Sequence, residues 1–139
     1  MIPFVVLLAL FCALFLLGQV GVAPGFGWWG SLRFALAGMF LVTASAHWGR
    51  RRPDLIRMVP PAFPRPDLIV TLTGVLEIAG ATGLMFARTA PYAGIALCAL
   101  LLAMFPANVH AARQHLSIGG RSVMSILPRG ILQLIFVGA

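Results

Sequence analysis

Apolar residues dominate five stretches of the chain, which are separated by short polar or proline-rich segments. The stretches are Ile2 to Val22, Gly30 to Trp48, Asp67 to Phe86, Pro91 to His110 and Ser122 to Gly138. A helix needs about 20 predominantly apolar residues to cross the hydrocarbon core of a bilayer, and each stretch approaches that length, the last being the shortest. The pattern therefore predicts five membrane-spanning helices, with four spans as the main alternative.

Composition agrees with a membrane location. Of the 139 residues, 60% are hydrophobic and only 9% are charged, which is too apolar for a water-compatible surface. The first stretch has no basic region before it and no clear A-x-A cleavage site, so we expect a retained helix rather than a secretory signal. The chain is thus predicted to be a single all-α integral membrane domain, residues 1–139, with no separate soluble catalytic domain.

Charge indicates which surfaces meet lipid. All ten basic residues are arginine, the net charge is +7, and the arginines concentrate in loops beside apolar stretches. Anionic lipid headgroups explain that placement better than nucleic acid does. The candidate headgroup contacts are Arg50, Arg51, Arg52 and Arg57. We expect a bacterial cytoplasmic (inner) membrane protein. Because the loops after the second and fourth stretches are the arginine-rich ones, the positive-inside rule places its amino terminus in the cytoplasm, and with five spans its carboxyl terminus is outside.

The longest linker, residues 49–66, is apolar as well as basic. Its segment from Val59 to Pro64 contains three prolines and cannot form regular helix. We expect the linker to lie at the membrane surface, with its apolar side chains in the acyl boundary. Those side chains are Leu55, Ile56, Met58, Val59 and Phe63. A stiff connector is the favoured interpretation, and a gate over a binding site is the alternative.

Glu77 is a lone carboxylate at the centre of the third stretch, in a chain with only three acidic residues. A charge at that depth costs about 2.5–3.5 kcal/mol on insertion scales, so we expect a polar partner inside the bundle. Helical spacing places Glu77 on a face of mostly small residues, which lets a neighbouring helix approach closely. That face consists of Thr73, Gly74, Glu77, Gly80, Ala81 and Leu84.

The preferred partner of Glu77 is Arg129, near the middle of the fifth stretch, with Gln133 one turn further along the same face. Arg33, near the outer end of the second stretch, is the competing partner because its long side chain can reach inward or snorkel outward. A purely structural ion pair is as good an interpretation of Glu77 as a functional carboxylate.

A second polar group is expected at the cytoplasmic ends of the spans. It comprises His47, Asp67, Asn108 and His110. Cys12 and Cys98 lie in separate stretches, which argues against a dithiol centre. His110 and His115 are five residues apart without a completing ligand set, so no metal site is predicted.

The order of several motifs resembles the DoxX-like membrane protein family. The motifs are Arg33 to Phe40, Ala46 to Trp48, Met58 to Pro66, Thr73 to Gly80, Phe105 to Val109 and Leu127 to Gln133. The resemblance implies a compact four-helix core, here residues 30–138, with the N-terminal span 2–22 added in front. Known members include hydrophobic subunits associated with thiosulfate to quinone electron transfer, proteins linked to quinone or thiol stress, and a chaperone for receptor assembly.

Three functions follow as hypotheses. The leading one is an accessory subunit that binds a quinone or another lipophilic molecule and supports a membrane redox partner, with His47 or His110 exchanging protons with the ligand. The second is an assembly factor or chaperone that docks client membrane proteins on the small-residue face and on the arginine-rich surface. The third is an intramembrane enzyme with Glu77 as its catalytic proton carrier. The absence of a dinucleotide-binding glycine pattern and of paired cysteines argues against a self-sufficient oxidoreductase.

Overall fold

The computed structural model describes residues 2–22 and 26–114, the backbone at 117–118 and 121–122, and residues 130, 131, 135 and 138. This part of the chain is helical, as predicted, apart from one very short antiparallel strand pair in which Ser117 lies opposite Ser122. The elements are α1 (Ile2–Gln19), α2 (Trp28–Ser45), α3 (Arg52–Met58), α4 (Pro66–Met85), α5 (Ala90–Arg113), β1 (Ser117–Ile118) and β2 (Arg121–Ser122).

Local sequence explains where α4 and α5 begin and end. Pro66 opens α4, where the missing amide hydrogen costs nothing, and Asp67 in the first turn complements the positive end of the helix dipole. Pro91 lies in the first turn of α5, and Arg113 in its last turn complements the negative end. The observed helix ends lie within a few residues of the predicted apolar stretches.

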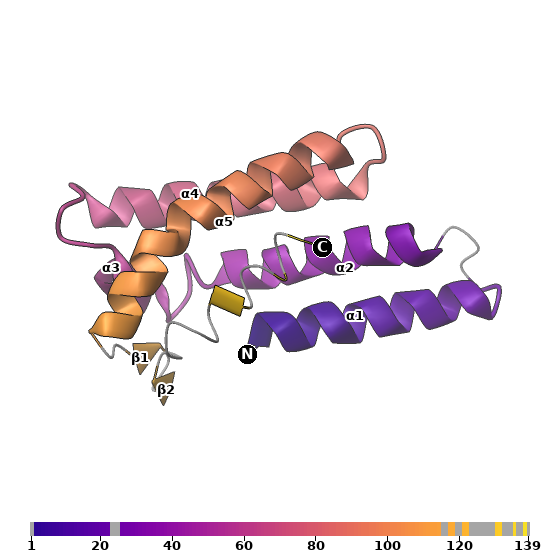
Figure 1. Ribbon diagram of the computed structural model, residues 1–139, viewed down its shortest axis with the longest axis horizontal. Helices are drawn as coiled ribbons and strands as arrows, with labels where there is room; N and C mark the ends of the chain where they lie inside the picture. Colours follow the sequence, from indigo (N-terminus) through magenta and orange to yellow (C-terminus); the bar gives the residue numbers. More distant parts are fainter. Residues whose placement is uncertain are drawn as a thin grey trace.

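The long helices pack in the order α1, α2, α4, α5 (Figure 1). Consecutive long helices run antiparallel, so the linker between α2 and α4 and the end of α5 share one end of the bundle, hereafter the linker end. The start of α2 and the connection 86–89 between α4 and α5 share the other, hereafter the turn end. The buried core follows the α2 and α4 interfaces. Its members are Leu7, Ala35, Leu36, Ala37, Met39, Phe40, Ala81, Leu84 and Leu97.

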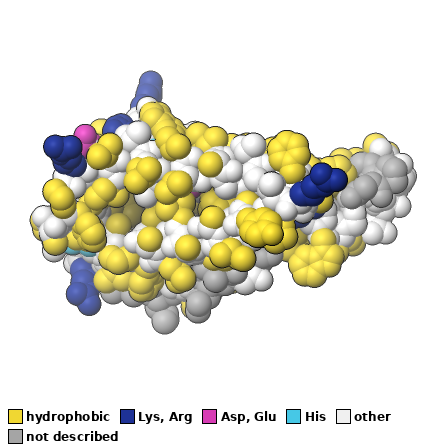
Figure 2. Space-filling view, turned by 90° about the horizontal axis from the view of Figure 1, so that it is seen from above, with side chains coloured by type: hydrophobic (Ala, Val, Ile, Leu, Met, Phe, Trp, Pro, Cys, Tyr) yellow, Lys and Arg dark blue, Asp and Glu magenta, His cyan; other side chains and the backbone are white. Residues whose placement is uncertain are grey.

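Three of the described helices, α1, α4 and α5, are long and apolar enough to cross a membrane. Figure 2 shows hydrophobic side chains over the middle of one face, with the arginines near its two ends. That distribution fits a membrane protein, whose middle contacts hydrocarbon while its ends contact headgroups. Helix α2 is as long as α1 but contains Arg33, Ser31 and Thr43. The prediction of five spans is thus supported for three helices.

The linker contains a helix that the sequence analysis did not anticipate. Helix α3 has Pro53 in its first turn, Asp54 near its positive end and Arg57 near its negative end, all favourable positions. The following proline-rich segment is irregular, as predicted. The predicted fifth stretch, with Arg129 and Gln133, lies almost wholly outside the described residues.

Candidate functional site

Glu77 is buried against α2 and is 4% exposed. The Thr43 hydroxyl donates a hydrogen bond to Glu77 Oε2 over 2.9 Å. His47 Nδ1 lies 4.0 Å from the same oxygen. Among the described residues, every buried side-chain nitrogen and oxygen has a hydrogen-bond partner. The carboxyl group is therefore integrated in the α2–α4 interface, which satisfies the expectation of a polar partner through a hydroxyl rather than through a described arginine.

His47 follows the end of α2 and is equally buried, 4% exposed. Its Nδ1 lies 3.3 Å from the Ala44 carbonyl oxygen, which orients the imidazole ring. The ring fits only because residue 74 on α4 is glycine: a Cβ there would lie 2.7 Å from His47 Cβ and 2.8 Å from the Trp48 ring. Gly74 therefore sets how closely the end of α2 approaches α4.

The predicted small-residue face of α4 is confirmed as a packing face. Five of its six residues are buried, all but Thr73. A Cβ on Gly80 would lie 2.5 Å from Leu97, and one on Gly83 would lie 2.7 Å from Ala93 Cβ, so α5 uses the same close approach. Because α2 and α5 of the same chain occupy this face, it is not free to dock a client protein, which leaves the arginine-rich surface as the docking site of the assembly-factor hypothesis.

A cavity of about 180 Å³ lies at the linker end. Three polar side chains, His47, Thr73 and Asn108, line it together with apolar side chains of the linker, α4 and α5. The apolar lining is Leu55, Met58, Val59, Pro60, Phe63, Ile69, Val70, Ala103, Met104, Pro106 and Ala107. His47 and Asn108 are thus brought together as predicted for the second polar group, whereas Asp67 and His110 do not line this cavity.

The linker forms one wall of this cavity. Met58 is buried, and Leu55, Ile56 and Val59 are half-buried, whereas Phe63 is exposed. The expectation that all five side chains enter the acyl boundary is therefore wrong for Met58, because the linker folds back over the end of the bundle. This arrangement supports the gate interpretation, which the sequence analysis ranked second.

Arg52 holds the linker in that position. Its guanidinium donates to the His47 carbonyl oxygen over 2.8 Å, to the Asp67 carbonyl oxygen over 3.1 Å and to the Thr71 hydroxyl over 2.9 Å. Arg52 thus connects the end of α2 to the start of α4, a role that differs from the expected headgroup contact. Arg50, Arg51 and Arg57 are exposed, although Arg57 also pairs with Asp54.

Pro106 interrupts the hydrogen bonding of α5 beside the cavity. It lies inside the helix and has no amide hydrogen for the carbonyl group of Leu102. Figure 1 shows the last turns of α5 bending toward α3. The bend brings Met104, Ala107 and Asn108 to the same cavity as the linker.

A family model described as Domain of unknown function (DUF8561) matches residues 36–138. The match covers most of the chain, including every residue of the linker-end cavity and of the Glu77 network. This protein belongs to the DUF8561 family. No match was found among curated proteins or among solved structures. The DUF8561 match carries no activity with it, and the DoxX-like resemblance stays a prediction.

Arg33 precedes the DUF8561 segment and does not contact Glu77. Its Nε donates to the Leu84 carbonyl oxygen over 3.1 Å, and its Nη2 donates to the Met85 carbonyl oxygen over 3.2 Å. A guanidinium at these positions compensates the unpaired carbonyl groups and the negative dipole end of α4. The prediction of Arg33 as a second-choice partner of Glu77 is therefore wrong. The preferred partner, Arg129, lies outside the described residues, as does Gln133.

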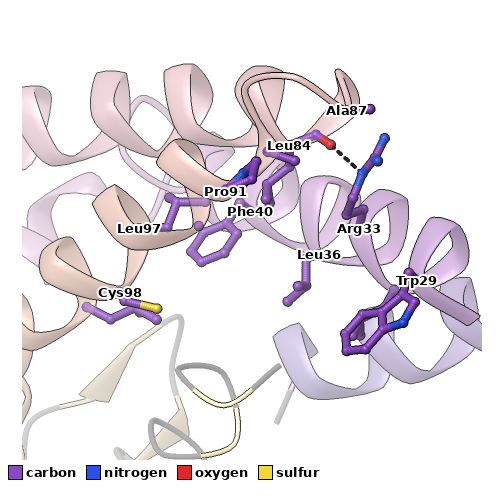
Figure 3. Close-up of a pocket in the computed structure, with 13 residues that line it drawn as sticks. Trp29, Arg33, Leu36, Phe40, Leu84, Ala87, Pro91, Leu97 and Cys98 are labelled. Atoms are coloured by element: carbon purple, nitrogen blue, oxygen red, sulfur yellow. Dashed lines mark hydrogen bonds between the residues drawn. The ribbon is translucent and has the colours of Figure 1, made fainter.

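A larger cavity of about 440 Å³ lies between α2 and α5, toward the turn end (Figure 3). Apolar side chains line it, and Arg33 lies at its rim with its guanidinium directed to the Leu84 carbonyl group. Glu77 lines neither of the two cavities described here. Direct contact between Glu77 and a bound substrate, which the intramembrane-enzyme hypothesis requires, thus finds no support in this arrangement.

Sequence reasoning missed two residues of the site. Thr43, the hydrogen-bond partner of Glu77, is an uncharged residue inside an apolar stretch, and its position four residues before His47 was the only signal. Arg52 was grouped with the surface arginines because its acceptors are mostly backbone oxygens, which sequence patterns do not display.

Proposed function

We propose that this protein is an accessory membrane subunit that binds a lipophilic molecule with a polar head, such as a quinone, under the linker and supports a membrane redox partner. The observation that carries the proposal is the linker-end cavity, where His47, Thr73 and Asn108 converge among apolar walls. A few placed polar groups in an apolar pocket are typical of small-molecule sites.

The chemistry of the lining suits a quinone head. Quinone carbonyl oxygens accept hydrogen bonds, and imidazole, hydroxyl and amide groups supply donors. The cavity, about 180 Å³, accommodates a head group rather than a whole prenylated molecule, so the tail would leave between the linker and α5 toward lipid. Met58 and Met104 provide adaptable apolar contacts to a planar ring.

The protein's own groups would orient the head and handle its proton. The Ala44 carbonyl oxygen and Gly74 fix the His47 ring, and Glu77 and Thr43 lie directly behind it. Glu77 is then a positioning residue, since it reaches the ligand only through His47. A bound quinone would supply reversible electron acceptance, and the redox partner would supply the electrons, because no described residue of this chain forms an evident redox centre.

The first experiment is gentle extraction followed by mass spectrometry of bound small molecules and co-purifying chains. Replacing Ala107 by leucine fills the cavity from α5, and Ala99→Leu on the exposed side of α5 is the matched control. We expect a quinone with the wild type and Ala99→Leu, and its loss with Ala107→Leu. Equal retention by all three proteins would refute the site, and recovery of partner chains without any ligand would favour a scaffold.

A further inference from the structure

The proposed function does not use the cavity between α2 and α5. Its lining comes from both helices and from the end of α4. Its volume, about 440 Å³, lies within the range of small-molecule pockets. Leu36, Phe40 and Leu97 form its deep part, and Figure 3 shows their side chains around the open centre. An occupant must therefore be apolar over most of its length.

The mouth of this cavity is positively charged. Arg33 lines it, and Arg88 follows the lining residue Ala87 in the exposed turn between α4 and α5. The two hydrogen bonds of Arg33 engage Nε and Nη2, so its guanidinium retains N–H donors for a further acceptor. Those two bonds end on neutral carbonyl oxygens, which offset the charge of Arg33 only in part.

The three acidic side chains of the protein all lie away from this mouth. Asp54 pairs with Arg57 in α3, and Asp67 lies in the first turn of α4, both at the linker end. Glu77 bonds Thr43 and lies seven residues before Leu84, the acceptor of Arg33, so it is nearer the linker end along α4. No acidic side chain therefore lies at this mouth to neutralise Arg33 and Arg88, so the two arginines can attract an external anion.

Two tryptophans locate this mouth in the headgroup region. Trp29, which lines the cavity, is 73% exposed, and the adjacent Trp28 is 56% exposed. Exposed tryptophans of membrane proteins gather at the membrane–water interface. The arginines at this end are then at the depth of lipid phosphates, and the cavity runs from there along α5, a helix apolar enough to span the membrane.

We propose that the cavity between α2 and α5 binds one acyl chain of an anionic phospholipid whose phosphate is held by Arg33 and Arg88. The headgroup supplies the missing negative charge, and the chain fills the apolar interior. This site is separate from the linker-end cavity, because the two share no lining residue. The test of this lipid site is therefore independent of the test of the proposed quinone site.

Gly94 offers a clean way to test the acyl-chain position. It lines the cavity, and a Cβ placed on it meets no atom within 4 Å. The Cβ of Gly94→Leu is thus unobstructed, its side chain would reduce the cavity, and the substitution would raise helix propensity. The matched control is Ala99→Leu, an exposed position five residues further along α5. Arg88→Gln tests the headgroup contact, with the exposed Arg113→Gln at the linker end as its control.

Native mass spectrometry of delipidated protein would count bound phosphatidylglycerol, phosphatidylcholine and palmitate at matched concentrations. We expect phosphatidylglycerol to bind about tenfold more tightly than phosphatidylcholine. Both variants should weaken its binding by about tenfold, Arg88→Gln because a charge-assisted contact is lost and Gly94→Leu because its side chain takes the space of the acyl chain. The two controls should bind as the wild type does. Unchanged phosphatidylglycerol binding by Gly94→Leu would overturn the site, and equally tight binding of palmitate would overturn the assignment to a phospholipid.

Discussion

The Thr43 hydroxyl lies 2.9 Å from Glu77 Oε2 and also 2.9 Å from the Phe40 carbonyl oxygen. A hydroxyl group carries one hydrogen, so it donates to only one of these two acceptors at a time. When Thr43 donates to Glu77, the Phe40 carbonyl oxygen receives no hydrogen from it. Both contacts are made together only if Glu77 carries a proton and donates to Thr43, which leaves the Thr43 hydrogen for Phe40. The geometry thus links the protonation of a buried carboxyl group to the packing of α2 against α4.

The first prediction concerns Glu77→Gln. A glutamine amide donates as a protonated carboxyl group does, so the free energy of unfolding in detergent should change by no more than about 0.5 kcal/mol. Glu77→Ala, which leaves a void between α2 and α4, should cost about 2 kcal/mol or more. Chemical unfolding followed by circular dichroism measures both. If Glu77→Gln destabilises the protein as much as Glu77→Ala does, Glu77 is ionised, and the predicted ion pair with Arg129 becomes the favoured interpretation.

Thr43→Val tests the other half of the same contact. It removes the hydroxyl while keeping the branched shape, and hydrogen bonds between membrane helices contribute about 0.6–1.7 kcal/mol. We expect the free energy of unfolding to fall by about 1 kcal/mol, with Thr43→Ser close to the wild type. Identical stability of the valine and serine variants would mean that this hydrogen bond contributes nothing.

The structure also predicts opposite responses at two glycines. A Cβ on Gly74 would clash with His47 at 2.7 Å, whereas one on Gly94 meets no atom within 4 Å. Gly74→Ala should therefore destabilise by about 1–3 kcal/mol through overpacking, while Gly94→Ala should be neutral or stabilising by up to about 1 kcal/mol. Thermal unfolding of the two variants compares them directly. A tolerated Gly74→Ala would contradict the close approach of α2 to α4.

Another prediction concerns the linker. Arg52→Gln removes hydrogen bonds that connect the end of α2 to the start of α4, and lysine would not replace the planar, forked guanidinium. Hydrogen exchange of backbone amides in residues 52–66 should become faster in Arg52→Gln and in Arg52→Lys. Arg51→Gln, at an exposed neighbouring position, should leave exchange unchanged. Equal exchange in Arg52→Gln and Arg51→Gln would show that Arg52 does not hold the linker.

Periodicity anticipated much of the fold. The spacing of small residues in α4 identified Gly74, Gly80 and Leu84 as a buried face, because a helix repeats its faces every three to four residues whatever it packs against. Apolar length located the helices to within a few residues. These features depend on local sequence alone, which is why the pattern was sufficient.

The contacts of the site were harder to predict. Arg33 and Arg52 bond mainly to backbone oxygens, and every residue carries such oxygens, so composition does not reveal the acceptor. Covering of the cavity by the linker depends on how residues 52–63 fold back over α4 and α5. That is a tertiary relationship between segments distant in sequence, with no periodic signal.

Trp48 provides a probe of the central claim, a lipophilic ligand in the linker-end cavity. Its ring centroid lies 6.1 Å from that of His47, and it is one of three tryptophans in the protein. With Trp28 and Trp29 replaced by phenylalanine, Trp48 becomes the only indole. Its fluorescence then reports on a short-chain quinone, which quenches nearby tryptophans.

The most direct measurement is therefore a titration of this single-tryptophan protein in detergent with decylubiquinone. The account predicts saturable quenching that Ala107→Leu weakens by about tenfold or more, as a filled cavity implies, and that Ala99→Leu leaves unchanged. Quenching that stays linear, or that is the same in Ala107→Leu and Ala99→Leu, would contradict ligand binding under the linker.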